Sequence, residues 1–433
     1  MANRPMRKAE CGCDTPIEMS SIKELQHFVS CALRCLRFRF IREDDDFEDE
    51  SVVFYPVMAH QVFGSEESIF GYQDLKVDIC FAAGSMDMYF NMTYSKKIED
   101  VNSWGIKADD VEKLFASLVE DGCYYTNLEE YKKVIKPKIE SFKPFGVKID
   151  EFKVNPEPKK YRDREFEVYA SDVSDKEFLK FHARMESLSF FYIDAFSRVD
   201  HDPLWLFLMI YEKYTDSNDE MRYGAVGFVS IYNFFAYPNS TRPRVSQIFI
   251  MPPFQNLGIG TRLIETTIHN YFVNKKEIAD ITYEEPTDVV QYIRSVVDAK
   301  RCKTLPAFSK KKLLKGFSKE MLSEAKESFK INPKHCRVIY EILRLRATNT
   351  ENPEEYRSYR LEVKKRLNSN YCKHRRDLER LQKRGLDMTG AFNAIPPVEE
   401  RMEQLDAEYK ELEKVYYKVL KKIKKTSKPH AKK

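Results

Sequence analysis

Two glycines, Gly258 and Gly260, stand at a turn where the chain could hold a phosphate. They lie in the stretch 255–260 (QNLGIG), which follows a short apolar run at 245–251. After them, apolar residues recur with helical spacing as far as Phe272. A helix that starts at a glycine turn exposes free main-chain N–H groups and the positive end of its dipole, and both attract phosphate. A tight turn without a ligand explains a bare Gly-x-Gly pair equally well.

A pair of adjacent carboxylates could act as a general base. Glu284 and Glu285 follow a predicted buried strand at 278–283 and directly precede Pro286. Their place at a strand terminus puts them beside the glycine turn, and neighbouring carboxylates raise one another's pKa, which suits a proton acceptor. The residues alone favour a simpler interpretation, in which a solvated acidic loop caps the next helix.

Cysteines and histidines offer no further reactive site. Among nine cysteines the only close pairs are Cys11/Cys13 and Cys31/Cys35, and neither has the spacing of zinc ligands. We therefore expect no metal, no cysteine nucleophile, and reduced thiols of the kind found in the cytosol or nucleus. His182 falls on the partly apolar face of a predicted helix, which favours a packed side chain over a catalytic one.

The composition is that of a folded protein with uneven charge. Hydrophobic residues make up 42% of the 433 residues, enough for a sizeable core in two or three domains. Net charge is +4, yet 43–50 (EDDDFEDE) is acidic and 421–433 is rich in lysine. Such blocks are mostly solvated; a patch for a basic partner and a nuclear-localisation or nucleic-acid-binding tail are the alternatives. No apolar run reaches membrane-spanning length and no signal peptide is evident, so we expect no membrane association.

A mixed sheet is predicted to position the turn and the carboxylates. Between 160 and 305, apolar strands at 204–211, 223–235 and 278–283 alternate with helical patterns. A capping box at 174–177 is expected to open one of these helices.

An α+β unit precedes this sheet. Alternating strands on either side of Gly84 and Ser85 predict a hairpin. Helices are expected at 109–120 and from Asn127 to just before Pro137.

A helical region follows the sheet. Helices are expected at 313–329 and 335–346, and apolar residues from Val398 to Ile423 keep the 4-3 spacing of a coiled-coil seam. An intramolecular helical hairpin with 354–385 explains this seam as well as oligomerisation does.

Longer motifs point to a family. The turn resembles the acetyl-CoA-binding pattern Gln/Arg-x-x-Gly-x-Gly/Ala of the GCN5-related N-acetyltransferase (GNAT) superfamily, which Gln255, Gly258 and Gly260 satisfy. Six further stretches are similar to the type B histone acetyltransferase catalytic subunit: 60–64, 143–146, 232–238, 241–247, 253–255 and 356–361. These landmarks run from about residue 50 to 361, so the resemblance covers most of the chain.

The resemblance implies an α+β fold with a central GNAT-type mixed sheet. It implies direct transfer of acetyl from acetyl-CoA to tail lysines of newly made histone H4, in support of chromatin assembly. The implied partners are histone H4 with H3 and a WD-repeat histone chaperone of the retinoblastoma-binding type, in nucleus and cytoplasm. Sequence-specific nucleic-acid binding is not expected. The alternatives are a GNAT enzyme for another amine, either a protein N-terminus or a small molecule, and a non-enzymatic basic protein.

With the resemblance, the chain divides into four parts. A flexible tail is expected at 1–20 and a substrate-side α+β domain at 21–150. An acetyl-CoA-binding catalytic domain follows at 151–305, and a helical domain with a basic tail at 306–433.

The resemblance also implies site residues. Ile248, Phe249 and Ile250 would offer main-chain groups to the pantetheine arm. The turn around the pyrophosphate would comprise Gln255, Asn256, Leu257, Gly258, Ile259, Gly260 and Thr261.

Acidic and aromatic residues complete the implied site. Glu284 falls on the family's general base, Glu285 holds a position usually occupied by Asp, and Asp194 one that is often Glu in relatives. The substrate groove would contain Trp205, Tyr232, Asn233 and Phe234, with Glu67 drawing the basic tail. For Trp205, within LWLFLMIY, burial in the sheet core is the strong alternative.

Overall fold

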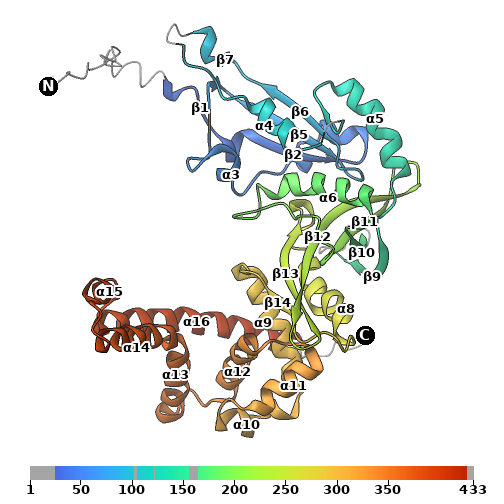
Figure 1. The fold of residues 1–433 in the computed structure, drawn as a ribbon. Helices are drawn as coiled ribbons and strands as arrows, with labels where there is room; N and C mark the ends of the chain where they lie inside the picture. The colour runs from blue at the N-terminus through green and yellow to red at the C-terminus, as the bar shows by residue number, and fades with distance from the viewer. Residues whose placement is uncertain (1–24, 102–104, 121, 156–163, 427–433) are drawn as a thin grey trace, which may run out of the picture.

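The computed structural model of the protein describes residues 25–101, 105–120, 122–155 and 164–426. A small N-terminal sheet with its helices, a six-stranded central sheet and a C-terminal group of helices follow one another along the molecule (Figure 1). This arrangement confirms the predicted α+β class. Within these ranges, no helix combines the length and apolar character needed to cross a membrane. The predicted tail at 1–20 lies outside the described residues.

The N-terminal sheet has the strand order β2-β5-β6-β8. Its strands are β2 (Leu36–Ile41), β5 (Lys76–Ala82), β6 (Met88–Thr93) and β8 (Tyr124–Tyr125). β5 and β6 pair antiparallel, which confirms the predicted hairpin, while β2 runs parallel to β5. The longer helices of this unit are α4 (Val111–Ser117) and α5 (Leu128–Ser141).

Helix α5 corrects one prediction. It continues through Pro137 to Ser141, although the sequence predicts an end before the proline. Tyr131, Ile135 and Ile139 recur every four residues and are all buried. Burial of Ile139, beyond the proline, offsets the main-chain hydrogen bond that Pro137 cannot donate.

The central sheet has the order β14-β13-β12-β11-β10-β9. Its strands are β9 (Val147–Val154), β10 (Arg164–Asp172), β11 (Trp205–Thr215), β12 (Met221–Ala236), β13 (Ser240–Ile250) and β14 (Thr282–Tyr283). All neighbours are antiparallel except β13 and β14, so the sheet is mixed as predicted. The predicted strand at 278–283 is shorter than expected, because only its last two residues pair with β13 over a continuous register.

Helix α6 (Lys176–Ser189) lies between the two sheets (Figure 1). Its N-cap is Asp175, whose carboxylate accepts hydrogen bonds from the N–H groups of Glu177 and Phe178. The sequence predicts a capping box that starts at Ser174, so the cap lies one residue later than predicted. His182 is buried between the rings of Phe207 (4.5 Å) and Phe228 (4.7 Å), which confirms a packed histidine.

One apolar core joins the N-terminal unit to the central sheet. Phe191, just beyond α6, stacks on Phe115 of the N-terminal unit at 5.8 Å and contacts Phe38 at 5.2 Å. The boundaries at 150 and 305 stay predictions.

The C-terminal helices follow helix α9 (Asp288–Cys302). They are α10 (Lys310–Lys315), α11 (Lys319–Phe329), α12 (Pro333–Ala347), α13 (Pro353–Leu367), α14 (Ser369–Lys383), α15 (Thr389–Asn393) and α16 (Val398–Thr426). Of these, α10 to α13 and α16 share a second core with α9. The single helix predicted at 313–329 is two helices, because Gly316, with a φ of +116°, ends the first.

The seam of α16 packs within the chain. Tyr409, Tyr416 and Val419 are buried in the second core, beside α9, α12 and α13. Met402 at the start of the seam is 56% exposed, on the arm that α14, α15 and α16 form (Figure 1). The buried part of α16 therefore packs against helices of the same chain, as the predicted intramolecular hairpin requires.

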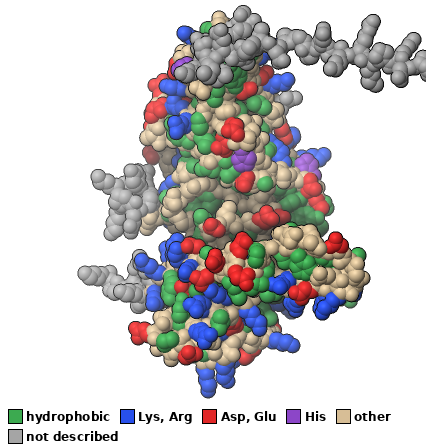
Figure 2. Space-filling view, turned by 90° about the vertical axis from the view of Figure 1, so that its left-hand side faces the viewer, with side chains coloured by type: hydrophobic (Ala, Val, Ile, Leu, Met, Phe, Trp, Pro, Cys, Tyr) green, Lys and Arg blue, Asp and Glu red, His purple; other side chains and the backbone are tan. Residues whose placement is uncertain are grey.

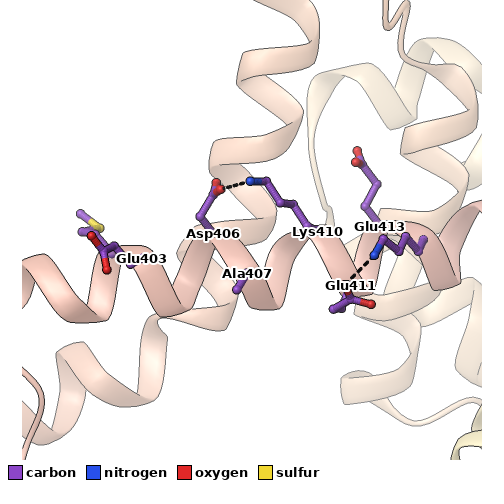
Figure 3. A pocket seen from close by; sticks show the side chains of 8 residues that line it. Glu403, Asp406, Ala407, Lys410, Glu411 and Glu413 are labelled. Atoms are coloured by element: carbon purple, nitrogen blue, oxygen red, sulfur yellow. Dashed lines mark hydrogen bonds and ion pairs between the residues drawn. The ribbon is translucent and has the colours of Figure 1, made fainter.

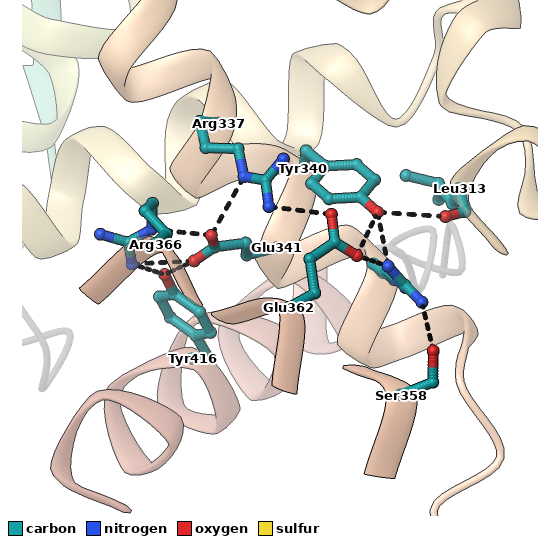
Figure 4. A network of polar contacts seen from close by, with 9 residues as sticks. Leu313, Arg337, Tyr340, Glu341, Ser358, Glu362, Arg366 and Tyr416 are labelled. Atoms are coloured by element: carbon teal, nitrogen blue, oxygen red, sulfur yellow. Dashed lines mark hydrogen bonds and ion pairs between the residues drawn. The ribbon is translucent and has the colours of Figure 1, made fainter. Parts of the chain in front are cut away.

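A buried polar network ties α12, α13 and α16 together (Figure 4). The Glu341 carboxylate accepts from Arg366 Nε (2.7 Å) and Nη2 (2.9 Å), from the Tyr416 hydroxyl (2.8 Å) and from Arg337 Nε (3.2 Å). A buried carboxylate is tolerated only when its oxygens are satisfied in this way. The network fixes the register of three helices whose sequence positions lie far apart.

Candidate active site

The glycine turn folds as a strand, a short turn and a helix. After β13, residues Pro252–Phe254 form a 3₁₀ turn and the helix starts at Ile259. Gly258 is its N-cap, with a φ of +84°, and no atom lies within 4 Å of the position that a Cβ would take. The Gln255 side chain donates to the Ile250 carbonyl (2.8 Å) and so ties the turn to the strand. Gly258 therefore puts no side chain beside the helix start, whose first N–H groups have no partner within the helix.

The helix behind this turn is continuous from Ile259 to Val273, with a π-helical segment at Leu263–Thr267. Its buried side chains include Ile259, Leu263, Ile264, Ile268 and Phe272, which confirms the predicted period. Packing of this apolar face against the core fixes the position of the helix, and with it the position of its first turn.

Strands β13 and β14 part at one edge of the sheet. They pair at Arg244–Thr282 and Val245–Tyr283; beyond Val245, β13 stays paired with β12 as far as Ile250 but has no partner strand on its β14 side. The N–H of Met251 donates to β12, and main-chain direction alternates along a strand. Ile248 and Ile250 consequently turn their main-chain groups toward the open side, which suits an extended ligand. Phe249 has a buried side chain and turns its main-chain groups toward β12, so the structure does not place it on the open side.

Glu284 stands where the two strands separate. Its N–H donates to the Val245 carbonyl (2.9 Å), and its carboxylate accepts from the Ser246 hydroxyl (2.5 Å). Arg244 Nη1 lies 3.7 Å from the other carboxylate oxygen. Glu285 is also exposed, and its φ of +31° turns the chain away from the strand direction. The structure thus anchors Glu284 firmly beside the open part of β13.

Three aromatic side chains line one face next to this point. The Trp205 and Tyr232 rings meet edge-on at 5.0 Å, and Phe234 follows at 4.6 Å from Tyr232. Arg244 stacks over the Phe234 ring at 4.4 Å while facing Glu284. Trp205 is partly buried and packs against the apolar core, so the sheet-core alternative holds in part.

Asn233 differs from its aromatic neighbours. Its side-chain amide donates to the Leu204 carbonyl across the sheet (3.1 Å), and neighbouring side chains of a strand alternate in direction. Tyr232 instead donates to Asp202 (2.8 Å), and Trp205 Nε1 donates to Asp200 (2.7 Å). The structure therefore brings Trp205, Tyr232 and Phe234 together on one face and leaves Asn233 out.

Asp194 and Glu67 meet through a histidine that the sequence reasoning did not assign a role. Nε2 of His60 lies 3.1 Å from an Asp194 oxygen, and its Nδ1 lies 3.6 Å from a Glu67 oxygen. Gln61 holds the two segments together by exchanging two hydrogen bonds with the main chain of Phe196. The available signal was the polar pair His60-Gln61 inside an otherwise apolar stretch.

Ser246 and Gln247 were also missed as site residues. They are the only polar residues in the apolar run 245–251. Gln247 accepts from the Ser230 hydroxyl (2.8 Å) and donates to the Ser197 carbonyl (3.0 Å). Polar residues inside an apolar strand were the signal that could have found them.

Comparison with known proteins identifies the family. Residues 28–194 match the model of the histone acetyl transferase HAT1 N-terminus. Residues 294–345 match the histone acetyltransferase type B catalytic subunit, C-terminal model. The human histone acetyltransferase type B catalytic subunit is 34% identical over 404 residues, which cover 93% of this chain and 95% of the relative. This chain belongs to the family of type B histone acetyltransferase catalytic subunits.

Other relatives agree with this assignment. The type B catalytic subunit of Rattus norvegicus is also 34% identical, over 93% of this chain and 95% of its own length. One from Dictyostelium discoideum is 30% identical, over 79% of this chain and 72% of its own length. A solved structure of an aminoglycoside acetyltransferase in complex with sisomicin is 16% identical to this chain. The match covers 28% of this chain and 78% of the other chain, and its TM-score of 0.20 is too low to support an argument.

For a type B histone acetyltransferase, the geometry fits acetyl-CoA as co-substrate. Gly258 leaves room for a phosphate against the helix start, and the open side of β13 offers main-chain partners for an extended arm. Glu284 stands at the far end of that open side, so a proton acceptor and a thioester could share one site.

Proposed function

We propose that this enzyme transfers the acetyl group of acetyl-CoA directly to lysine side chains in the N-terminal tail of newly synthesised histone H4, in support of chromatin assembly. The observation that carries the proposal is the anchoring of Glu284 by Ser246 at the point where β13 and β14 part. A lysine is mostly ammonium at neutral pH, and only its neutral amine can attack a thioester. A proton acceptor at this point meets that need.

Each part of the site has a role under this proposal. Acetyl-CoA supplies the reactive thioester when bound. The N–H groups of residues 255–261 hold the pyrophosphate, and the main chain of Ile248 and Ile250 aligns the pantetheine arm. Glu284 accepts the proton of the attacking amine.

The substrate side suits a basic peptide. Trp205, Tyr232 and Phe234 offer aromatic faces, and Asp194 and Glu67 offer carboxylates, next to the open strand. Cations bind aromatic faces and are attracted by carboxylates. Partnership with histone H3 and with a WD-repeat histone chaperone, in nucleus and cytoplasm, completes the proposal on the strength of the family.

Mass spectrometry of acetyl transfer tests the proposal. The purified full-length protein is incubated with acetyl-CoA and either intact H3–H4, an H4 tail peptide, or the same peptide with every lysine replaced by arginine. We expect acetylated lysines in the first two samples and no product in the third. Acetylation of the arginine peptide at its α-amine, or of a small amine in preference to the tail, would instead establish an acetyltransferase for another amine. Co-purification and imaging in cells test the chaperone and the location.

A further inference from the structure

The outward face of α14 is a row of cations. Five basic side chains lie on or directly beyond this helix and are all exposed: Lys373, Arg376, Arg380, Lys383 and Arg384. Successive members are mostly three or four residues apart, so they share one side of the helix. Leu378, on the other side, is buried. We call the five residues the α14 basic face.

The α14 basic face holds a large share of the excess charge of the chain. Residues 369–384 include six basic and two acidic side chains, a balance of +4. The whole chain of 433 residues also has a formal net charge of +4. The residues outside this segment therefore sum to zero, and α14 is, with the lysine-rich stretch 421–433, one of the places where positive charge is concentrated.

Neighbouring carboxylates do not neutralise this face. Among the described residues, the ion pairs of α14 are Arg375–Glu379 (3.3 Å) and Arg380–Asp377 (3.4 Å), both within the helix. Lys373, Arg376 and Lys383 form none with any residue that the structure describes.

The facing helix α16 shows the contrast. On the part of α16 that belongs to the arm, two exposed cations are paired, Lys410 with Asp406 (2.8 Å) and Lys414 with Glu411 (2.6 Å) (Figure 3). Asp406 also accepts from Lys364 of α13 (2.5 Å). From the side of the arm, acidic side chains gather in the midst of scattered Lys and Arg over the C-terminal half (Figure 2). Asp406, Glu408 and Glu411 of α16 are thus engaged in ion pairs with residues other than those of the α14 basic face, which keeps its charge for another partner.

We propose that the α14 basic face binds the phosphate backbone of nucleic acid without reading its sequence. The outward positions carry cations and no large apolar side chain, whereas protein partners are usually held by aromatic or apolar anchors. From Lys373 to Lys383 the helix rises about 15 Å, over which duplex DNA carries about nine phosphates. Arginine also matches phosphate oxygens with two parallel hydrogen bonds. A regular polyanion therefore fits this face better than a folded protein surface.

The position of α14 leaves the candidate active site free. The arm of α14, α15 and α16 projects from the helical end of the molecule, away from β12 and β13 (Figure 1). Nucleic-acid binding and acetyl transfer are therefore independent, and one can fail without the other.

Fluorescence anisotropy with the full-length protein tests the inference. A labelled mixed-sequence 20-base-pair duplex is titrated at several salt concentrations between about 50 and 300 mM. Four phosphate contacts predict a slope of log affinity against log salt of about −4. Two unrelated duplex sequences should bind within about threefold of each other, because phosphate contacts carry no sequence information.

Two matched variants decide the outcome. Replacing Lys373, Arg376, Arg380 and Lys383 by Gln should weaken binding at least about tenfold at 100 mM salt and flatten the slope by about 3 to 4. The control replaces the same number of exposed lysines elsewhere in the helical region by Gln: Lys310, Lys311, Lys315 and Lys334. It should bind within about twofold of the wild type.

Three results would overturn the inference: an α14 variant that binds like the wild type, a control that weakens as much, or polyglutamate of equal charge that competes as well as unlabelled DNA. Circular dichroism checks that the helices persist. A second variant, Arg376→Lys with Arg380→Lys, keeps the charge and should retain binding within about threefold. Acetyl transfer to H4 peptide should be unchanged in all variants, which separates this result from the proposed function.

Discussion

The substitution Glu284→Gln tests the assignment of the general base with little disturbance of the fold. The Ser246 hydroxyl donates to a Glu284 oxygen at 2.5 Å, and the amide oxygen of Gln can accept the same hydrogen bond. The second anchor, from the Glu284 N–H to the Val245 carbonyl, is main chain and does not change. The variant therefore removes the basic oxygen while the residue stays in place.

The expected loss in kcat follows from the usual contribution of a general base and from the solvent exposure of the Glu284 carboxylate. A positioned general base contributes about 10²- to 10⁴-fold, or about 3 to 5 kcal/mol of barrier. The Glu284 side chain is 49% exposed, so water can replace part of its action. We therefore expect the lower half of that range, a fall in kcat of about 10²- to 10³-fold at pH 7. The KM for acetyl-CoA should stay within about twofold, because the turn at 255–261 is untouched.

A pH series with an H4 tail peptide provides the decisive readout. Between pH 7 and 9 the neutral fraction of a lysine amine rises about 100-fold, so the variant should recover most of that factor while the wild type gains less. A kcat at pH 7 within threefold of the wild type, or a flat pH profile of the variant, would refute the assignment. Glu285→Gln is the matched control and should cost less than about threefold. If it costs as much as Glu284→Gln, the base is Glu285.

Three further predictions concern the scaffold. In Gly227→Ala the added Cβ would lie 2.1 Å from the Phe249 carbonyl oxygen, so β12 and β13 must move apart; we expect a loss of about 3 kcal/mol in thermal unfolding and weaker acetyl-CoA binding by calorimetry. Glu341→Gln leaves the Arg366 guanidinium without its carboxylate, which should cost about 3 kcal/mol and lower the melting temperature measured by circular dichroism. Burial raises the pKa of Glu186 to about 7, so the folded state holds this proton more tightly than the unfolded chain. Its stabilising contribution is complete below the unfolded pKa and is lost as pH rises through 7; the wild type should lose about 2 to 3 kcal/mol more than Glu186→Gln between pH 5 and 8 in urea unfolding.

Local patterns were sufficient for the cofactor side of the site. The strand, turn and helix around Gly258 depend on nearby residues: an apolar run, two glycines and a helical period that reaches Phe272. The same holds for the hairpin at Gly84. Errors arose where distant packing overrode a local signal, as at Pro137, whose helix continues because Ile139 is buried beyond it.

The substrate side depends on contacts that no local pattern contains. Asp194 and Glu67 are far apart in the sequence, and only the fold places His60 between them. In the same way Arg244 belongs to β13, yet it links Phe234 of β12 to Glu284 beyond β14. That link exists only because Arg244 pairs with Tyr232 on one side and with Thr282 on the other. A shift of one residue in either register would turn Arg244 away from the acid or the ring. The register of β13 therefore determines whether the aromatic face and the general base form one site, and this is why a substitution such as Gly227→Ala, remote from Glu284, should impair transfer as well as stability.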